Sequence, residues 1–246
     1  MSLCNVSFRG ESIGKACGMN VMLPDEGDGP FAVLYLLHGL SDDYTIWQRR
    51  TSVERYAADH GLIVVTPDGH RSFYCNDPRP GGMAYEDHIV KDVVGFVDKW
   101  FPTVPQRRGR AIAGLSMGGY GSMMLALRHP DMFAAVSSHS SAFGFAHEQR
   151  GRAGIDDLAA ALPEGEYDCF TLAEKLQAAG GDLAIRFDCG TEDGLLEGNR
   201  AFHAHLDAIG VAHGYAEYPG EHNWAYWDEH VQETLAFVAG HVSAGA

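Results

Sequence analysis

Short apolar runs of strand length alternate along this chain with segments of helical periodicity, and this alternation constrains the fold more than any other feature. Residues 31–37 read FAVLYLL and stop at His38 and Gly39, and residues 62–65 read LIVV. A continuous apolar run of this length indicates a strand buried on both faces, as in a parallel sheet. Strands that alternate with helices form right-handed βαβ units, whose helices cover both faces of the sheet.

The whole pattern predicts an α/β fold with a mostly parallel sheet of about eight strands and helices on both faces. An antiparallel pair is expected first, at residues 3–9 and 17–23. Further strands are expected at residues 31–37, 62–65, 111–113, 133–138, 183–188 and 213–218. Helices are expected at residues 51–60, 86–100, 117–129, 171–179, 196–209 and 224–240.

The alternation fails between residues 140 and 170, apart from an alanine-rich stretch at 157–162. A connection this long inside a compact domain is typical of a lid or a binding loop. The length of 246 residues fits one domain. We therefore expect a single domain over residues 1–246 with a lid-like insertion at about 140–170, in which Phe143 and Phe145 are candidates for shaping a pocket.

The charge balance limits the partners that the chain is expected to bind. The formal net charge is -15, so phosphate backbones and anionic lipid surfaces would repel the protein. We expect no nucleic-acid partner and no membrane partner. The N-terminus lacks a basic region followed by an apolar run, and no apolar stretch approaches the roughly 20 residues that a bilayer requires, which predicts a cytoplasmic location.

Cysteine usage points to neither a disulfide framework nor a zinc knuckle. The five cysteines are odd in number and scattered, and the sequence contains no C-x-x-C motif. Buried free thiols are expected instead.

A nucleophile motif lies at one of the predicted junctions between strand and helix. Residues 114–118 read GLSMG, which satisfies G-x-S-x-G. In this motif the serine occupies a strained turn, where side chains at the flanking glycine positions would clash, and its hydroxyl is exposed above the sheet. The motif in this context predicts the α/β-hydrolase fold, with Ser116 as the nucleophile.

A serine hydroxyl is a weak nucleophile and needs a general base, which in this fold comes last in the chain order Ser, acid, His. His222 lies in YPGEHNW at residues 218–224, just past the last predicted strand and before the terminal helix. It is the predicted base, since a loop there can bring the imidazole over the sheet edge to Ser116.

The other histidines after Ser116 fit structural or solvated roles better. His129 precedes Pro130 at a predicted helix end, and His139 and His147 lie at or within the irregular segment. His203 and His205 fall on different faces of a predicted helix, so the two do not form a metal pair.

The acid that orients the base is expected after the strand at 183–188. Residues 187–194 read FDCGTEDG and offer three carboxylates. Asp188 falls inside the strand and Glu192 is expected to point away, whereas Asp193 lies at the apex of the loop. Asp193 is therefore the predicted acid, which accepts the Nδ1–H bond of His222, and Asp188 and Glu192 remain alternatives.

Acyl transfer also needs N–H donors for the oxyanion that develops on the substrate carbonyl. The backbone amide of Met117, at the start of the helix after the nucleophile, is one candidate. The second is Leu40, in the turn after His38 and Gly39.

Together these motifs resemble the putative-esterase branch of the α/β-hydrolases, and within it the tributyrin-esterase-like carboxylesterases. The resemblance is carried by residues 36–43 (LLHGLSDD), 67–74 (PDGHRSFY), 114–121 (GLSMGGYG), 189–193 (CGTED) and 220–224 (GEHNW). It extends from about residue 5 to 240. It implies a triad of Ser116, Asp193 and His222 and oxyanion amides at Leu40 and Met117, in agreement with the assignment from the residues.

The sequence thus predicts a serine carboxylesterase that hydrolyses short-chain, small-molecule esters through an acyl-enzyme, without a metal or a cofactor.

The same branch includes S-formylglutathione hydrolases, feruloyl and acetylxylan esterases, and mycolyltransferase-like proteins. An S-formylglutathione hydrolase or other thioesterase and an acyltransferase therefore remain alternatives. S-formylglutathione hydrolases usually carry a cysteine shortly after the His-Gly-Leu turn, where this chain has Ser41, Asp42 and Asp43. A non-catalytic binding protein would normally have lost a triad residue. The oligomeric state stays open.

Overall fold

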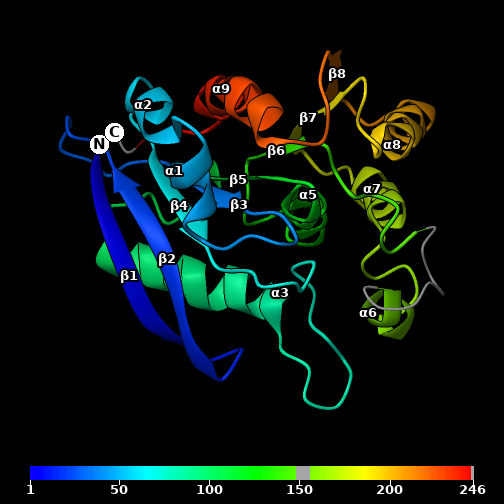
Figure 1. Ribbon diagram of the computed structural model, residues 1–246, viewed down its shortest axis with the longest axis horizontal. Coiled ribbons are helices and arrows are strands. Elements are labelled where there is room, and N and C mark those ends of the chain that lie inside the picture. Colours follow the sequence, from blue (N-terminus) through cyan, green and yellow to red (C-terminus); the bar gives the residue numbers. More distant parts are fainter. Residues whose placement is uncertain (148–155, 245–246) are drawn as a thin grey trace.

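An eight-stranded sheet forms the centre of the computed structural model, which describes residues 1–147 and 156–244 (Figure 1). The strand order is β1-β2-β4-β3-β5-β6-β7-β8. β1 pairs antiparallel with β2, and β2 with β4, whereas the five remaining pairings are parallel. The strands are β1 (Ser2–Gly10), β2 (Lys15–Leu23), β3 (Val33–Leu37), β4 (Ile63–Pro67), β5 (Arg110–Leu115), β6 (Ala135–His139), β7 (Ala184–Gly190) and β8 (Gly214–Tyr218). The predicted mostly parallel sheet is confirmed.

The strand β3 shows why its sequence is apolar at every position. Successive side chains of a strand point to opposite faces of the sheet. Val33, Tyr35 and Leu37 belong to the hydrophobic core on one face, and Leu34 and Leu36 belong to the core on the other. All five are fully buried, so a polar residue at any of these positions would be buried as well.

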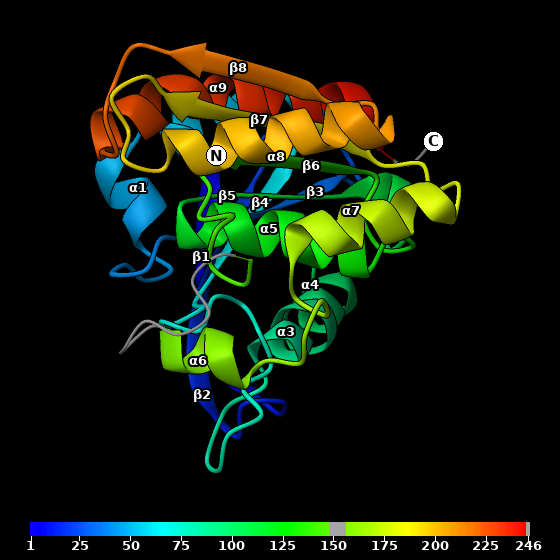
Figure 2. The same cartoon turned by 90° about the vertical axis from the view of Figure 1, so that its right-hand side faces the viewer.

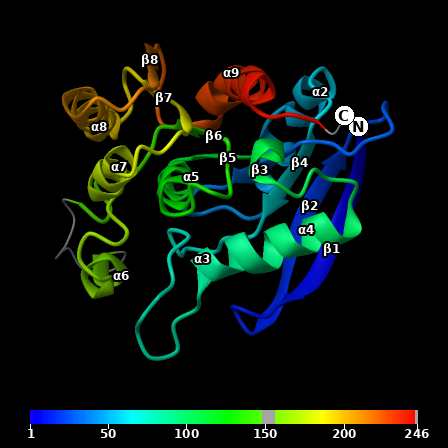
Figure 3. The same cartoon turned by 180° about the vertical axis from the view of Figure 1, so that it is seen from behind.

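Helices cover both faces of the sheet (Figures 1 and 3). The core of one face includes side chains of α1 (Ile46–Arg50), α2 (Val53–Ala58) and α9 (Trp224–His241). The core of the other includes side chains of α4 (Val94–Trp100), α5 (Met117–Arg128), α7 (Cys169–Ala178) and α8 (Leu196–Ile209). The remaining elements are α3 (Tyr85–Asp87), the π-helical turn η1 (His88–Val93), the 3-10 turn η2 (Arg107–Gly109) and α6 (Asp156–Ala161).

Two helical regions differ from the sequence prediction. The helix expected at residues 51–60 is the shorter α2, and α1 before it was not predicted because it has only five residues. The helix expected at 86–100 is present, but it consists of α3, η1 and α4 in succession.

Phe8 of β1 packs on Phe96 of α4 with ring centroids 4.9 Å apart, which attaches the antiparallel hairpin to the domain core.

The cysteines and the helices bear on two further expectations. All five cysteines are free thiols, as predicted; Cys17, Cys75, Cys169 and Cys189 are buried, whereas Cys4 is half-buried. Within residues 1–147 and 156–244, none of the helices has the length and apolar composition needed to cross a bilayer.

A buried carboxylate joins three segments beneath the sheet. Glu86 of α3 is 3% exposed and accepts hydrogen bonds from Arg128 Nε (2.8 Å), His129 Nε2 (2.8 Å) and Tyr167 Oη (2.7 Å). Burial raises the pKa of Glu86, but these hydrogen bonds outweigh burial and lower the pKa to about 2. Glu86 is therefore ionised in the folded protein at every pH at which a glutamate of the unfolded chain would be ionised.

Replacing Glu86 by glutamine should lower the free energy of unfolding by about 2 kcal/mol at pH 7. Because the folded pKa lies below the ordinary value of 4.5, the carboxylate's contribution is present above pH 4.5 and is lost as pH falls toward 2. The difference between wild type and Glu86→Gln should therefore shrink between pH 4.5 and 2. Urea unfolding at pH 7, 4 and 3 measures it, with exposed Glu164→Gln as the control. A difference that stays constant over this range would contradict the assignment.

Candidate active site

Ser116 occupies the strained junction between β5 and α5. Its backbone φ is 53° and its ψ is -114°, a combination that residues other than glycine rarely adopt. The surrounding backbone holds it there. The Ser116 N–H donates to the carbonyl of His139 (2.9 Å), and its own carbonyl accepts from the N–H groups of Tyr120 (3.0 Å) and Ala142 (3.2 Å).

The glycines that flank the serine are required by close approaches of backbone. A Cβ on Gly114 would lie 2.4 Å from the carbonyl oxygen of Gly118. A Cβ on Gly118 would lie 2.6 Å from the carbonyl oxygens of both Leu37 and His38. Backbone atoms cannot move aside as a flexible side chain can, so the first turn of α5 reaches the end of β3 only without side chains here.

The three residues predicted as a triad lie within hydrogen-bonding distance of one another. His222 Nε2 is 3.0 Å from Ser116 Oγ, and His222 Nδ1 is 2.8 Å from Asp193 Oδ2. Ser116 follows β5, Asp193 follows β7 and His222 follows β8. Because the carboxyl ends of parallel strands meet at one edge of the sheet, loops distant in sequence converge there.

The surroundings of Asp193 keep its side chain charged. The carboxylate is fully buried and also accepts the Leu195 N–H (2.8 Å). Burial raises the pKa of Asp193, but the hydrogen bonds from His222, Leu195 and Ser140 outweigh burial, so on balance the pKa is lowered. An ionised Asp193 accepts a hydrogen bond from the Nδ1–H of His222, which leaves Nε2 unprotonated and facing the serine hydroxyl.

The two alternative acids are placed elsewhere. Asp188 is fully buried within β7 and contacts His139 Nδ1 (2.9 Å), Arg186 Nη1 (2.6 Å) and Tyr226 Oη (2.7 Å). Glu192 is exposed and accepts from the hydroxyl of its neighbour Thr191 (3.2 Å). Neither contacts His222, so the geometry favours Asp193.

Two residues beside this triad were missed by the sequence analysis. The Trp227 ring of α9 meets the His222 ring edge-on at 4.9 Å, and its Nε1–H donates to Ser140 Oγ (3.2 Å). Ser140, with a φ of 48°, in turn hydrogen-bonds the carboxylate of Asp193. Ser140 and Trp227 therefore position His222 and Asp193. The signal for Ser140 in the sequence is the run of serines around the end of β6, at the start of the expected insertion.

The turn that carries Leu40 lies directly beside the serine. A Cβ on Gly39 would be 3.9 Å from Ser116 Cβ. The Gly39 carbonyl accepts from His38 Nδ1 (2.7 Å) and from the Asp42 N–H (3.3 Å), and His38 Nε2 accepts the Gly69 N–H (2.8 Å). These bonds fix the peptide unit whose N–H belongs to Leu40. Met117, the other predicted donor, is the first residue of α5.

One cavity lies next to this turn, and a second adjoins it. One, of about 360 Å³, is lined by Leu40, Asp42, Asp68 and Arg71, among others. The other, of about 540 Å³, shares His70 and Arg71 with the first and reaches Tyr85 and Leu158. Three aspartates and one arginine, Arg71, are among the residues that line the part nearest Leu40, so the space beside the turn suits a small or polar group.

The segment at 140–170 contributes both to the core and to a cavity. Residues 148–155 lie outside the described residues. Phe143 is 1% exposed and packs against Phe187 and Phe202, so an alanine there would open a hole in the core. Phe145 stacks on Phe73 with centroids 3.6 Å apart. Among the described residues of the segment, Leu158 of α6 is the one that lines the larger cavity, and Figure 2 shows α6 beneath α5 and α7, away from the sheet.

A model of the family described as "Putative esterase" matches residues 10–238, which is nearly the whole chain. The chain belongs to this esterase family. The acetyl esterase of Caldicellulosiruptor saccharolyticus is 26% identical over 97% of this chain and 98% of its own length.

Solved structures agree with this assignment. The fluorophosphonate-binding serine hydrolase FphF of Staphylococcus aureus superposes with a TM-score of 0.87 at 30% identity, over 97% of this chain and 98% of its own. The S-formylglutathione hydrolase FrmB of the same species gives 0.85 at 30% identity, over 97% and 100%. This esterase therefore has the α/β-hydrolase fold and is a serine carboxylic ester hydrolase, which confirms the predicted fold, family and activity.

Proposed function

We propose that Ser116, His222 and Asp193 are the catalytic residues of this esterase and act in a two-step mechanism. Ser116 Oγ attacks the ester carbonyl while its proton passes to His222 Nε2. The tetrahedral intermediate collapses, the bond to the alcohol oxygen breaks, and the alcohol leaves with the proton from His222. Water, deprotonated by His222, then attacks the acyl-enzyme; the bond from the acyl carbon to Ser116 Oγ breaks, Oγ takes the proton back from His222, and the acid is released. No step uses a metal or a cofactor.

The oxyanion of both intermediates is proposed to be bound by the amides of Leu40 and Met117. Preorganised donors of this kind act without reorganising as charge develops. The bonds that His38 and Asp42 make to the Gly39 carbonyl support this role for Leu40, because they hold its peptide unit rigid beside Ser116. Met117 supplies an N–H at the first turn of α5, where no intrahelical partner exists.

One observation carries the proposal: a single imidazole lies between the strained elbow serine and a buried carboxylate, at 3.0 Å and 2.8 Å. This arrangement can make a serine nucleophilic at neutral pH. Loss of activity on replacing Ser116, without loss of fold, is its direct test.

The proposed substrates are short-chain esters such as acetate, butyrate and tributyrin. The charged side chains around the cavity beside Leu40 support this range, since a long acyl chain needs an extended apolar wall. The name of the Caldicellulosiruptor relative, acetyl esterase, also supports it. The chain is further proposed to be one domain in which residues 140–170 form a lid-like insertion, with Leu158 facing the substrate. The expected cytoplasmic location stays a prediction.

Replacing Leu158 by alanine should change chain-length preference more than turnover on acetate. A small acetyl group would not reach α6, whereas a longer acyl chain or bulkier alcohol would lie against the enlarged cavity. The hexanoate-to-acetate ratio of kcat/KM for p-nitrophenyl esters should rise about threefold or more, because burying one or two extra methylenes contributes about 0.8 kcal/mol each. Phe143→Ala is the control, since it should lower stability without moving this ratio. An unchanged ratio in Leu158→Ala would show that α6 does not face the substrate.

S-formylglutathione hydrolysis is the second candidate function. It is favoured by the likeness to FrmB, and the same triad would serve, because only the leaving group differs. The polar, charged lining near Arg71 suits a peptide-like thiol as well as a small alcohol. Comparing kcat/KM for S-formylglutathione and p-nitrophenyl acetate separates the two: a preference of 100-fold or more for the thioester would make it the main activity.

A further inference from the structure

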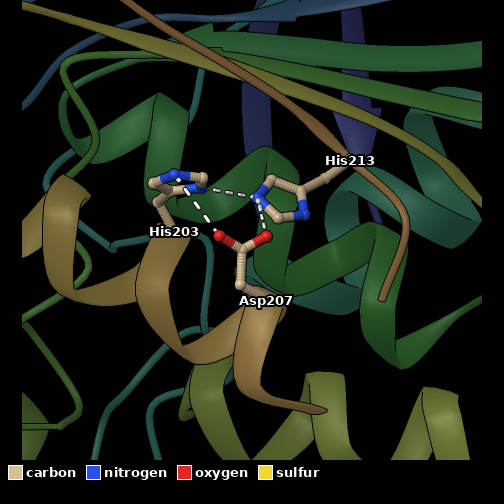
Figure 4. Close-up of side chains that lie close together, drawn as sticks. All are labelled: His203, Asp207 and His213. Carbon is tan, nitrogen blue, oxygen red and sulfur yellow. Dashed lines mark hydrogen bonds and ion pairs between the residues drawn. The ribbon is translucent and has the colours of Figure 1, made fainter. Parts of the chain in front are cut away.

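Two histidines and an aspartate meet on the surface near the end of α8. His203 and Asp207 are four residues apart on this helix, so they lie one above the other on one face. His213 comes from the loop that leads into β8 and points at the same spot (Figure 4). One ligand atom from each of the three lies within 4.8 Å of the others.

The orientation of His213 is typical of a histidine that binds a metal. Its side chain is 3% exposed, and its Nδ1 donates to the carbonyl of Val211 (2.8 Å). That bond leaves Nε2 with its lone pair, directed at His203 Nδ1 (2.8 Å) and Asp207 (3.9 Å). A second ring nitrogen bound to a backbone carbonyl is the usual way in which a ligating histidine is held.

The three residues fit a divalent transition metal better than a hard cation. Two imidazoles and one carboxylate form a donor set for zinc, whereas Mg²⁺ and Ca²⁺ prefer oxygen ligands. Tetrahedral coordination with bonds of 2.0–2.1 Å separates two nitrogens by about 3.3 Å, so the rings would move apart by about 0.5 Å. The side chains of His203 and Asp207 are 37% and 63% exposed, which leaves room for this movement and for a water as fourth ligand.

We propose that His203, Asp207 and His213 form a surface site for a divalent metal of the zinc type. The metal replaces the proton that His203 and His213 share. The sequence analysis rejected a metal pair of His203 with His205, and the structure agrees, because His205 points instead to the carbonyl of Phe170 (3.2 Å). The partners of His203 are Asp207, one turn further along α8, and His213, in the loop between α8 and β8.

The position of the site gives it a structural role. α8 begins just after Asp193, and β8 ends just before His222, whereas the site joins the far ends of these two elements. A bound metal would therefore hold together the unit that carries the proposed base and acid, without touching substrate. The expected consequence is a higher thermal midpoint with little change in kcat.

Calorimetric titration of the chelator-treated protein with ZnCl₂ tests this site. Wild type should show one saturable site that His203→Asn and Asp207→Asn each weaken at least tenfold. His205→Asn, on the same helix, should bind as wild type does. Zinc at 100 times its dissociation constant should raise the thermal midpoint by about 5 °C in wild type and in His205→Asn only, and MgCl₂ should not.

The proposal would be overturned if His203→Asn bound zinc with the same affinity as wild type. It would also be overturned if His205→Asn lost as much zinc affinity as His203→Asn. Asp207→Asn keeps the test decisive if a histidine variant is unstable, because the Asp207 side chain is the most exposed of the three. Activity on p-nitrophenyl acetate, measured without metal, should be unchanged in His203→Asn and in Asp207→Asn.

Discussion

Replacing Ser116 by alanine is expected to lower kcat for p-nitrophenyl acetate by about four to six powers of ten, with the thermal midpoint nearly unchanged. The serine hydroxyl is proposed to be the atom that is acylated, so no other group in the site can replace it. The strained backbone at this position is held by hydrogen bonds from its N–H and to its carbonyl, which alanine keeps. The loss should therefore appear in the chemistry and not in the fold.

Pre-steady-state kinetics give this variant a sharp readout. Wild type should release a burst of p-nitrophenol close to one equivalent per enzyme wherever deacylation is slower than acylation. Ser116→Ala should release none. Circular dichroism and the thermal midpoint serve as controls for folding, and a burst that persists in a folded Ser116→Ala protein would rule out Ser116 as the nucleophile.

Asp193→Asn should lower activity with little effect on stability, whereas Asp188→Asn should mainly lower stability. Asp193→Asn should lower kcat by about 10⁴, because an amide cannot hold the His222 tautomer and cannot stabilise the imidazolium. Asp188→Asn should instead lower the free energy of unfolding by about 3 kcal/mol, because it leaves the largely buried guanidinium of Arg186 without its counter-charge. Both are aspartates of the same strand and loop, so they control for each other.

The physical basis is the set of partners of each carboxylate. Burial raises the pKa of Asp188, but His139, Arg186 and Tyr226 outweigh it and lower the pKa on balance, so the folded protein holds Asp188 as an anion. Asp193 contacts His222 instead. Exposed Glu192→Gln should change neither property. If Asp188→Asn were the more damaging to kcat while unfolding as wild type does, the acid would have to be reassigned.

Some parts of the structure could be predicted because their determinants are local in sequence. The burial of β3 follows from five consecutive apolar residues, and the elbow follows from two glycines around a serine. His222 and Asp193 could be chosen because loops after parallel strands meet at one edge of the sheet. In each case the residues and their neighbours in the chain contain the information.

Other parts depend on contacts that only the folded chain makes. α1 is too short to show a periodicity, and Ser140, just after β6, and Trp227 of α9 contact Asp193 and His222 from the side. Phe143 was expected in a pocket because its segment is irregular and polar, yet its ring packs in the core on Phe187 and Phe202. Sequence pattern gives the average environment of a segment, not the direction of one side chain.

Covalent labelling with a fluorophosphonate, followed by peptide mapping, tests whether Ser116 is the nucleophile. The nucleophile displaces fluoride from phosphorus and keeps the phosphonyl group, so the modified residue is identified by mass. We expect one phosphonyl group per chain, on Ser116, with labelling strongly slowed in an Asp193→Asn protein. A stable adduct on any other residue, or a wild-type enzyme that hydrolyses esters and remains unlabelled at Ser116, would contradict it.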